Sequence, residues 1–351
     1  MTDFIEIDEE TLQDIINIET GLLYPLQGFM NEADFRGVVD TYQLSDGQVF
    51  TIPVTLDIPE DSSPVHGQTL HLSFHGKHVA DLEVEDTYRV NDADLEKVFC
   101  TLDMAHPGVR KEKERSPLRV GGKTTLLEGE LLEGALKPEN TKKIFADRGW
   151  KTVAGFQTRN PVHKAHEHLQ RIGLEVCDGL FINPIIGWKK KGDFTQEAVV
   201  AAYEKMTEEF YPKNSVYMEG LKTQMRYAGP REAVFHAIIR RNLGCTHFII
   251  GRDHAGVGGF YGAYDAHALA GKLAEEHDLG IQLLLLHEPY YCKKCGMVVS
   301  EKSCSHYETD RVEISGTIIR KYIGEGSIPD EIMLRKEIFD AILNCGQIFI
   351  E

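Results

Sequence analysis

The stretch Val153-Ala-Gly-Phe-Gln-Thr-Arg-Asn-Pro-Val-His-Lys-Ala-His166 joins a short apolar run to a helical pattern. The apolar run, residues 153–156, has the length and composition of a buried strand. Asn160 is a favourable N-cap residue, and Pro161 suits the first helical position because its missing N–H would be unpaired there anyway. The sequence therefore predicts a strand, a loop and a helix that begins at about Pro161.

The first turn of this helix is a candidate anion site. His163 and His166 are three residues apart, which predicts both imidazoles on one helix face. The N–H groups and the positive dipole end of a helix N-terminus bind anions. Gln157 and Arg159 precede the helix and are expected to project towards the same volume. These donors fit phosphoryl-type transfer, which depends on positioning and charge stabilisation. A structural or metal-binding histidine pair is the alternative interpretation.

Strand-like and helical patterns alternate from residue 151 onward. Alternation of this kind predicts βαβ units around a parallel sheet, with ligands outside the carboxyl ends of the strands. The loops after Phe156 and Ile250 are therefore the places to search for a site. The predicted strands are 153–156, 179–186, 215–218, 246–250 and 281–286, and the predicted helices are 161 onward, 195–210, 231–242 and 264–277.

The loop after Ile250 reads Gly251-Arg-Asp-His-Ala-Gly-Val-Gly-Gly259 and holds four glycines in nine residues. Glycine permits positive φ and close approach of the backbone to a ligand. Arg252 and His254 add donors, and Asp253 is placed to orient one of them. This pattern predicts a phosphate cradle. The two common glycine-rich nucleotide signatures, G-x-x-x-x-G-K-[ST] and G-x-G-x-x-G, are absent.

The first 145 residues have a different sequence pattern, without sustained alternation of strands and helices. Alternating apolar residues at 70–74 and 79–84 flank the turn His75-Gly-Lys77, which predicts a β-hairpin with one buried face. Residues 109–123 are polar, charged and turn-rich, and we expect a loop there. This segment is predicted to be a β-rich domain with a few short helices.

The length of 351 residues predicts two or three domains. A formal net charge of −17 argues against nonspecific nucleic-acid binding, which depends on Lys and Arg. Anionic substrates would then need a confined cluster of Arg, Lys and His. The N-terminus does not resemble a signal peptide, and no apolar run is long enough to span a membrane. A soluble, cytoplasmic protein is expected.

The seven cysteines include one cluster, Cys292-x2-Cys295-x8-Cys304-x-His306. Three thiolates and one imidazole are typical of a closed, structural zinc site. The spacing therefore predicts Zn²⁺ bound by Cys292, Cys295, Cys304 and His306, holding the C-terminal segment in place. His287 is an alternative fourth ligand, and a redox-active CxxC pair is an alternative function.

Five segments of the chain resemble the ATP sulfurylase (sulfate adenylyltransferase) family. QTRNPVHKAH (157–166) is similar to the first signature of that family, and GRDHAGVG (251–258) is similar to its second. The resemblance extends to residues 225–256, to PLQGFM (25–30) and to ISGTIIR (314–320), so it covers nearly the whole chain. With no P-loop, the sequence resembles the short form without a kinase domain, which is usually dimeric.

The resemblance implies an enzyme that converts MgATP and sulfate into adenosine 5′-phosphosulfate and pyrophosphate, reversibly, with Mg²⁺ bound to ATP. It implies a PUA-like β domain (1–145), a Rossmann-like parallel-sheet nucleotidylyltransferase domain (146–290) and a small zinc-containing domain (291–351). Two alternatives stay open: a nucleotidylyltransferase with another acceptor, and a non-catalytic zinc-containing binding protein. Sulfate assimilation, sulfate respiration and sulfur oxidation are all compatible with one active site, so the physiological direction stays open.

The resemblance also implies roles for individual residues. Sulfate is expected at Gln157, Arg159 and the backbone of Ala255. The catalytic motif is expected at Thr158, Arg159, Asn160, His163 and His166. The ATP site is expected at Gln157, Thr158, Arg159, Asn160, His163, His166, Gly251, Arg252, Asp253 and His254.

Two further segments have less certain roles. Lys189–Lys191 could contact pyrophosphate, but a solvated charge run is the more ordinary interpretation. In ISGTIIR, Ser315 or Thr317 could cap a helix that ends near Arg320, and Thr317 or Arg320 could contact a phosphate.

Overall fold

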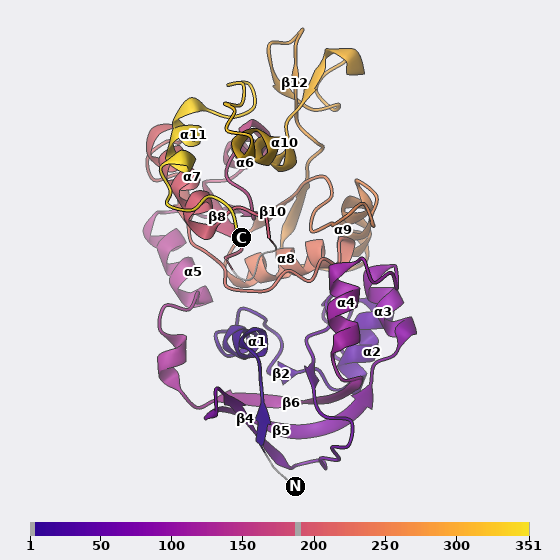
Figure 1. Cartoon of the computed structure of the whole chain (residues 1–351). Helices are drawn as coiled ribbons and strands as arrows, with labels where there is room; N and C mark the ends of the chain where they lie inside the picture. Colours follow the sequence, from indigo (N-terminus) through magenta and orange to yellow (C-terminus); the bar gives the residue numbers. More distant parts are fainter. Residues whose placement is uncertain (1–3, 187–190, 351) are drawn as a thin grey trace. The chain divides into compact units, whose positions relative to one another are not determined.

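The computed structural model describes residues 4–186 and 191–350. Contacts within the chain divide it into two compact units, each assembled from separate stretches of sequence (Figure 1). The first unit comprises Met1–Lys142, Lys222–Gly244 and Asp253–Ile281, and the second comprises Lys143–Leu221, Cys245–Arg252 and Gln282–Glu351. The linking helix α5 (Pro138–Asp147) runs from the first unit into the second.

The first unit is built on a six-stranded sheet with the order β1-β4-β5-β6-β2, in which β3 also pairs with β6. The predicted hairpin is confirmed, because β4 and β5 pair antiparallel with Leu70 opposite Leu82. Leu70, Leu72 and Leu82 are buried on one face of the hairpin. The strands are β1 (Phe4–Glu6), β2 (Gly28–Phe29), β3 (Leu56–Asp57), β4 (Thr69–Phe74), β5 (Lys77–Arg89) and β6 (Leu118–Leu126).

The prediction of a loop over residues 109–123 is wrong. The chain forms the end of helix α4 (Pro107–Glu114) and the start of β6, which pairs with β5 along most of its length. Gly122 is required at this pairing, because a Cβ atom there would lie 2.0 Å from the carbonyl oxygen of Glu83. The charge of Arg119 is buried in an ion pair with Glu112 at 3.0 Å, so a polar pattern concealed a central strand.

Helices complete the first unit, and two of them come from later in the chain. They are α1 (Glu9–Glu19), α2 (Glu32–Thr41), α3 (Asp92–Phe99), α4, the short 3-10 helix η1 (Gly129–Leu132), α8 (Pro230–Asn242) and α9 (Asp265–Glu276). Helix α8 is buried at every position from Arg231 to Arg240.

The second unit contains the predicted parallel sheet. All five predicted strands are confirmed, and every strand pair is parallel. The spatial order β11-β10-β7-β8-β9 is that of a doubly wound sheet. The switch point, where the direction of the strand order reverses, lies between β7 and β10. The strands are β7 (Val153–Thr158), β8 (Gly179–Pro184), β9 (Val216–Met218), β10 (His247–Ile250) and β11 (Gln282–Leu285).

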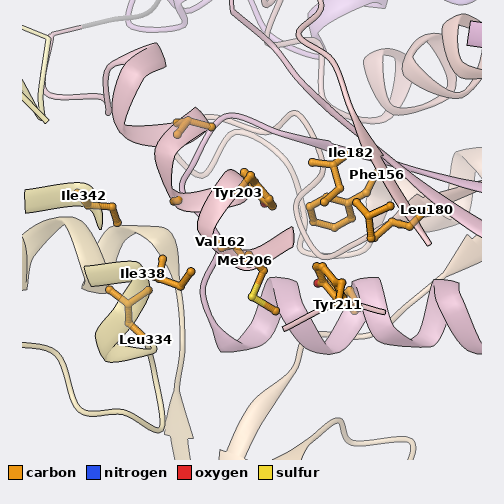
Figure 2. Close-up of a cluster of buried hydrophobic side chains, with 14 of the residues drawn as sticks. Phe156, Val162, Leu180, Ile182, Tyr203, Met206, Tyr211, Leu334, Ile338 and Ile342 are labelled. Atoms are coloured by element: carbon orange, nitrogen blue, oxygen red, sulfur yellow. The ribbon is translucent and has the colours of Figure 1, made fainter. Parts of the chain in front are cut away.

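One hydrophobic cluster joins this sheet to four helices. The helices are α6 (Lys164–Val176) and α7 (Gln196–Glu209) from the crossovers, and α10 (Gly316–Gly324) and α11 (Lys336–Leu343) from the end of the chain. Figure 2 shows Phe156 and Leu180 of the sheet, Tyr203 of α7 and Ile338 of α11 among the side chains of this cluster. The last two helices therefore complete the core around the parallel sheet.

A separate three-stranded sheet lies between β11 and α10 in the sequence. Its strands β12 (Tyr290–Cys292), β13 (Met297–Val299) and β14 (Arg311–Glu313) have the order β13-β12-β14. The 3-10 helix η2 (Glu308–Asp310) precedes β14, and Tyr290, Cys292 and Val299 form a small apolar cluster of their own. The chain is thus an α/β protein with an N-terminal β sheet, a parallel-sheet unit and this cysteine-bearing insert. The domain boundaries at 145 and 290 stay predictions.

Candidate active site

The two candidate loops leave neighbouring strands at the switch point of the parallel sheet. β7 and β10 are paired, with His247 opposite Ala154 and Phe248 opposite Gly155. Gln157 and Thr158 end β7, and Gly251 follows the last residue of β10. Parallel strands end at the same sheet edge, so both loops start where ligands of doubly wound sheets bind.

Helix α6 begins later than predicted. It starts at Lys164, and its N-cap is His163 rather than Asn160. The backbone N–H of Lys164 donates to the carbonyl of Met333 at 2.8 Å, and Pro161 and Val162 are buried. These tertiary contacts keep residues 161–163 out of the helix, with His163 extended, and override the local preference of Asn160 and Pro161 for a helix start.

His163 and His166 are brought together as predicted. Their rings are stacked, with centroids 3.9 Å apart, and Nδ1 of His163 accepts a hydrogen bond from the backbone N–H of His166 at 3.3 Å. His163 is only 6% exposed. A neutral His163 that accepts at Nδ1 carries its proton on Nε2, which is then the ring donor available to a ligand.

Both rings are held in the neutral form. Burial, with a smaller contribution from the adjacent His166, lowers the pKa of His163 well below 6.5. Burial lowers the pKa of His166 to about 4, against a weaker opposing effect of the Pro161 carbonyl. At neutral pH the pair therefore supplies polar N–H groups rather than positive charge.

The loop between β7 and α6 is held in one conformation by its own side chains. The hydroxyl of Thr158 accepts from the backbone N–H of Asn160 and donates to its carbonyl, both at 3.1 Å. The side-chain oxygen of Asn160 accepts a hydrogen bond from Arg320 at 3.1 Å. Arg159 lies between these two anchored residues and is half-buried.

The sequence suggested Arg320 as the approximate end of a helix and as a possible phosphate contact. It links Asn160 to Asp193, whose carboxylate lies 3.3 Å from the guanidinium. Gly316 is packed against the Asn160 side chain, where an added Cβ would come within 2.9 Å of Asn160 Nδ2. Ser315 caps α10, as one of the two predicted possibilities, and the helix continues beyond Arg320 to Gly324.

The second loop is divided between the units. Gly251 and Arg252 belong to the second unit, where Arg252 pairs with Glu288 at 3.2 Å and its side chain is 46% exposed. Burial raises the pKa of Glu288, an effect that Arg252 opposes. Asp253, His254 and Ala255 belong to the first unit.

Backbone conformation in this second loop is unusual around His254. Asp253 and Ala255 both have positive φ, 49° and 58°, although neither is glycine. Left-handed conformations of this kind are concentrated at binding and catalytic sites. His254 Nε2 lies 3.1 Å from Nδ1 of His236 on α8, a contact between residues of the first unit that the sequence did not predict.

The predicted cysteine cluster is assembled on the β12–β14 insert. His306 Nδ1 lies 3.3 Å from the sulfurs of Cys292 and Cys295 and 3.5 Å from that of Cys304. Cys295 and Cys304 sulfurs are 3.7 Å apart, close to the roughly 3.8 Å edge of a tetrahedron with metal–sulfur bonds of about 2.3 Å. The four side chains can therefore hold a metal ion such as zinc.

The alternative fourth ligand lies elsewhere. His287 Nδ1 lies 2.6 Å from the carboxylate of Glu301 and does not belong to the cysteine cluster. Among the helices that the structure describes, none has the length and apolar character needed to cross a membrane.

Comparison with protein-family models gives two matches. The ATP-sulfurylase model matches residues 133–345, which is more than half of the chain, and the PUA-like domain model matches residues 2–129. The chain belongs to the ATP-sulfurylase family. The family match contains both candidate loops and the cysteine cluster, and the PUA-like match contains the N-terminal β sheet.

Full-length relatives agree with this membership in the ATP-sulfurylase family. A sulfate adenylyltransferase of Hyperthermus butylicus is 46% identical over 344 residues, covering 96% of this chain and 88% of the relative. One from Ignicoccus hospitalis is 44% identical over 352 residues, covering 99% and 91%. A solved structure, a hexameric APS kinase from Thiobacillus denitrificans, matches with a TM-score of 0.70 at 20% identity. It covers 97% of this chain and 62% of that chain, and this likeness concerns the fold alone.

The stacked histidine pair predicts an unusual titration of His166. In nuclear magnetic resonance spectra, the His166 ring is expected to stay neutral from pH 8 to 5.5 and to titrate near its pKa of about 4. The unfolded chain takes up this proton near pH 6.5. The contribution of His166 to the free energy of unfolding is therefore present above pH 6.5 and lost as the pH falls towards 4.

A His166→Asn variant assigns the resonance and is expected to flatten this part of the pH dependence in urea unfolding. A His166 midpoint near 6.5 would contradict the effect of the stacked arrangement on this ring.

Proposed function

We propose that this chain is a sulfate adenylyltransferase, which joins sulfate to the α-phosphorus of MgATP to give adenosine 5′-phosphosulfate and pyrophosphate, reversibly. The observation that carries the proposal is the loop Gln157–His166 at the switch point of the sheet, in a chain whose full-length relatives bear that name. Gln157 and Arg159, in the same loop as the histidines, are the residues that favour sulfate over another acceptor in this proposal.

Sulfate is proposed to bind at Gln157, Arg159 and the backbone N–H of Ala255. A guanidinium presents parallel donors that match two oxygens of a tetrahedral oxyanion. Ala255 has positive φ, as expected where backbone N–H groups are turned to a ligand. Arg159 stands between Thr158 and Asn160, whose mutual hydrogen bonds limit the movement of the loop.

The ATP phosphates are proposed to lie over the start of α6. The helix N-terminus, Nε2–H of His163 and the ring of His166 supply donors, and Gly251, Arg252, Asp253 and His254 complete the site. In a molecule of net charge −17, neutral donors and a few arginines build an anion site without a broad positive surface.

The reaction is proposed to be a direct displacement. A sulfate oxygen attacks the α-phosphorus, the bond from that phosphorus to the bridging oxygen breaks, and pyrophosphate leaves with the electron pair. Sulfate is a dianion at neutral pH, so no general base is needed. Catalysis then consists of alignment and stabilisation of the charge on the α-phosphate oxygens and the leaving group. Mg²⁺ enters with ATP, where it neutralises phosphate charge.

The metal of the cysteine cluster is inferred to be Zn²⁺ with a structural function. Three thiolates and one imidazole fill a tetrahedral shell, which leaves no open position for a substrate. Bound zinc would hold β12, the turn before β13 and the segment that leads to β14 as one unit.

Further expectations accompany the proposal. A homodimer and a cytoplasmic location belong to it, together with domains at 1–145, 146–290 and 291–351. Lys189 and Lys190 lie outside the described residues, and Lys191 is exposed. A pyrophosphate contact from this segment stays a prediction.

Replacement of Arg159 tests the sulfate site. Arg159→Lys keeps the charge but loses the parallel donors, so sulfate-dependent pyrophosphate release from MgATP should fall about 100-fold or more in kcat/KM for sulfate. The wild-type protein should also release pyrophosphate with molybdate, another tetrahedral dianion. Initial rates of pyrophosphate release measure both.

Arg89→Lys is the matched control, because Arg89 is 58% exposed in a surface ion pair with Glu60. It should leave the kinetics unchanged. Unchanged activity in Arg159→Lys would place sulfate elsewhere, and a wild-type protein inactive with both anions would favour another acceptor.

Replacement of Cys295 tests the zinc site. Purified wild-type protein should contain about one zinc per chain by mass spectrometry of the metal, and Cys295→Ser should contain far less and unfold at lower temperature, because zinc binding contributes to folding stability. Cys100→Ser, at an exposed cysteine outside the cluster, serves as control. A full zinc content in Cys295→Ser would refute the assignment.

A further inference from the structure

Three ionisable side chains in successive contact connect the buried helix α8 to the second loop, residues 251–259. Glu232 and His236 are one turn apart on the helix and are 0% and 1% exposed at their side chains. Glu232 Oε1 lies 3.5 Å from His236 Nε2, and His236 Nδ1 lies 3.1 Å from His254 Nε2. We name this set the Glu232–His236–His254 relay.

Glu232 is the fixed, anionic end of the relay. Its two carboxylate oxygens accept hydrogen bonds from the backbone N–H groups of Arg226 and Ala228, at 2.9 and 3.0 Å. Burial acts to raise the pKa of Glu232, but the neighbouring His236, the backbone N–H of Arg226 and the charge of Arg226 outweigh it and lower the pKa. At 3.5 Å, Nε2 of His236 faces Glu232 without the geometry of a hydrogen bond, and the negative carboxylate favours the tautomer that carries its proton on this nitrogen.

The proton of the next contact follows from this assignment. Burial lowers the pKa of His236, although Glu232 opposes it, and the charges of Arg240 and Arg226 act with burial. His236 is therefore neutral, with a lone pair on Nδ1. The hydrogen bond to His254 then requires the His254 proton on Nε2. This leaves Nδ1 of His254 as the ring nitrogen for any other partner.

The loop around His254 is also fixed at its backbone. The N–H of Asp253 donates to the carbonyl of Ala263 at 2.8 Å, and the carbonyl of Ala255 accepts from Gly229 at 3.3 Å. These bonds hold the backbone on both sides of His254, and the contact with His236 restricts the rotation of the His254 ring.

We propose that Glu232 and His236 are positioning residues of the nucleotide site, which fix the ring orientation and tautomer of His254 so that Nδ1 is directed to a phosphate of ATP. This inference rests on the proposed function, because His254 is one of the residues assigned there to ATP. It adds two residues that touch no substrate and act through another side chain.

Two isosteric replacements of His236 separate positioning from packing. His236→Asn keeps an acceptor at the place of Nδ1, facing His254, and loses the partner of Glu232. His236→Gln keeps a donor at the place of Nε2, facing Glu232, and loses the contact with His254. The relay predicts a loss of about 10- to 100-fold in kcat/KM for ATP in His236→Gln and less than about threefold in His236→Asn.

A second readout does not depend on activity. Nitrogen-15 spectra of the wild-type protein without ATP should show His254 protonated on Nε2, and His236→Gln should lose this preference. A His254 protonated on Nδ1 alone would overturn the inference. Equal losses in the two variants, or the larger loss in His236→Asn, would show a packing role and overturn it too. A wild-type protein without sulfate-dependent activity would refute the proposed function, and the spectra would still decide the relay.

A second, independent feature lies on the N-terminal sheet, where His71, His78 and Asp81 converge. The same carboxylate oxygen of Asp81 lies 2.6 Å from His71 Nδ1 and 2.7 Å from His78 Nε2. His71 and Asp81 are directly opposite in the β4–β5 pairing. Phe4 packs against both rings, with centroids 5.1 and 5.6 Å away. We name these three ligands the hairpin cluster.

The hairpin cluster has the chemistry of a metal site. Its three ligand atoms all lie within 4.8 Å of one another, and each side chain is about one-third exposed. Burial raises the pKa of Asp81, but the hydrogen bonds from His71 and His78 outweigh it and lower the pKa. Metal–ligand bonds of about 2.1 Å place neighbouring ligands roughly 3.4 Å apart, so the contacts would widen by less than about 1 Å.

We infer that the hairpin cluster binds a divalent ion of the imidazole-preferring class, Zn²⁺ or Ni²⁺, with water in the remaining positions. Calorimetric titration of protein already loaded with one equivalent of Zn²⁺ should show a second, weaker equivalent. The double variant His71→Ala/His78→Ala should bind one equivalent fewer, with at least a tenfold loss of affinity at this site.

His66→Ala is the control for the hairpin cluster, because His66 is exposed on the same unit and lies outside the cluster, with its Nδ1 2.9 Å from the carbonyl of Glu85. It should bind as the wild type does. Equal stoichiometry in wild-type protein and the double variant would overturn the inference.

Discussion

The stacked imidazoles of His163, which is buried, and His166, which is half-buried, constrain the rest of the proposed site. Two stacked rings 3.9 Å apart repel each other if both are charged, and loss of solvent around them keeps their pKa values low. The start of α6 therefore offers directed N–H groups and a helix dipole, and in the proposed site Arg159 and Arg252 supply the full positive charges. In a strongly acidic protein, such an arrangement confines the attraction for anions to one end of one sheet.

The second unit is organised to keep that end rigid. Met333 accepts from the first N–H of α6, and Arg335 binds both carboxylate oxygens of Glu167 in its first turn, at 2.7 and 2.9 Å. Burial opposes but does not prevent a pKa of about 2 for Glu167, so this ion pair persists throughout the neutral range. Arg320 similarly fixes Asn160. The C-terminal helices therefore support the site as well as the hydrophobic core.

Much of this architecture could be predicted because it depends on patterns of residues that are close together in the sequence. The alternation of short apolar strands with helices of 12 to 14 residues gave the parallel sheet, and the spacing of Cys292, Cys295, Cys304 and His306 gave the cluster. The loops after β7 and β10 could be placed at the same sheet edge, because the carboxyl ends of neighbouring parallel strands lie together.

The features that escaped prediction depend on distant contacts. The start of α6 is decided by Met333, and strand β6 depends on the approach of Gly122 to Glu83 and on the buried pair of Arg119 with Glu112. His236 lies on a helix buried on every side, where no amphipathic pattern marks one residue above another. Its partner in the second loop becomes apparent only when the folded chain brings the two rings together.

The central claim is that the imidazole pair stabilises charge and does not attack phosphorus. The most direct measurement uses ATP with sulfur in place of one α-phosphate oxygen, as a single stereoisomer, and determines the configuration of the adenylyl product formed with sulfate. A single in-line displacement predicts inversion at the α-phosphorus. Retention would require two displacements through a covalent adenylyl-enzyme, with His163 or His166 as the nucleophile, and would contradict the account.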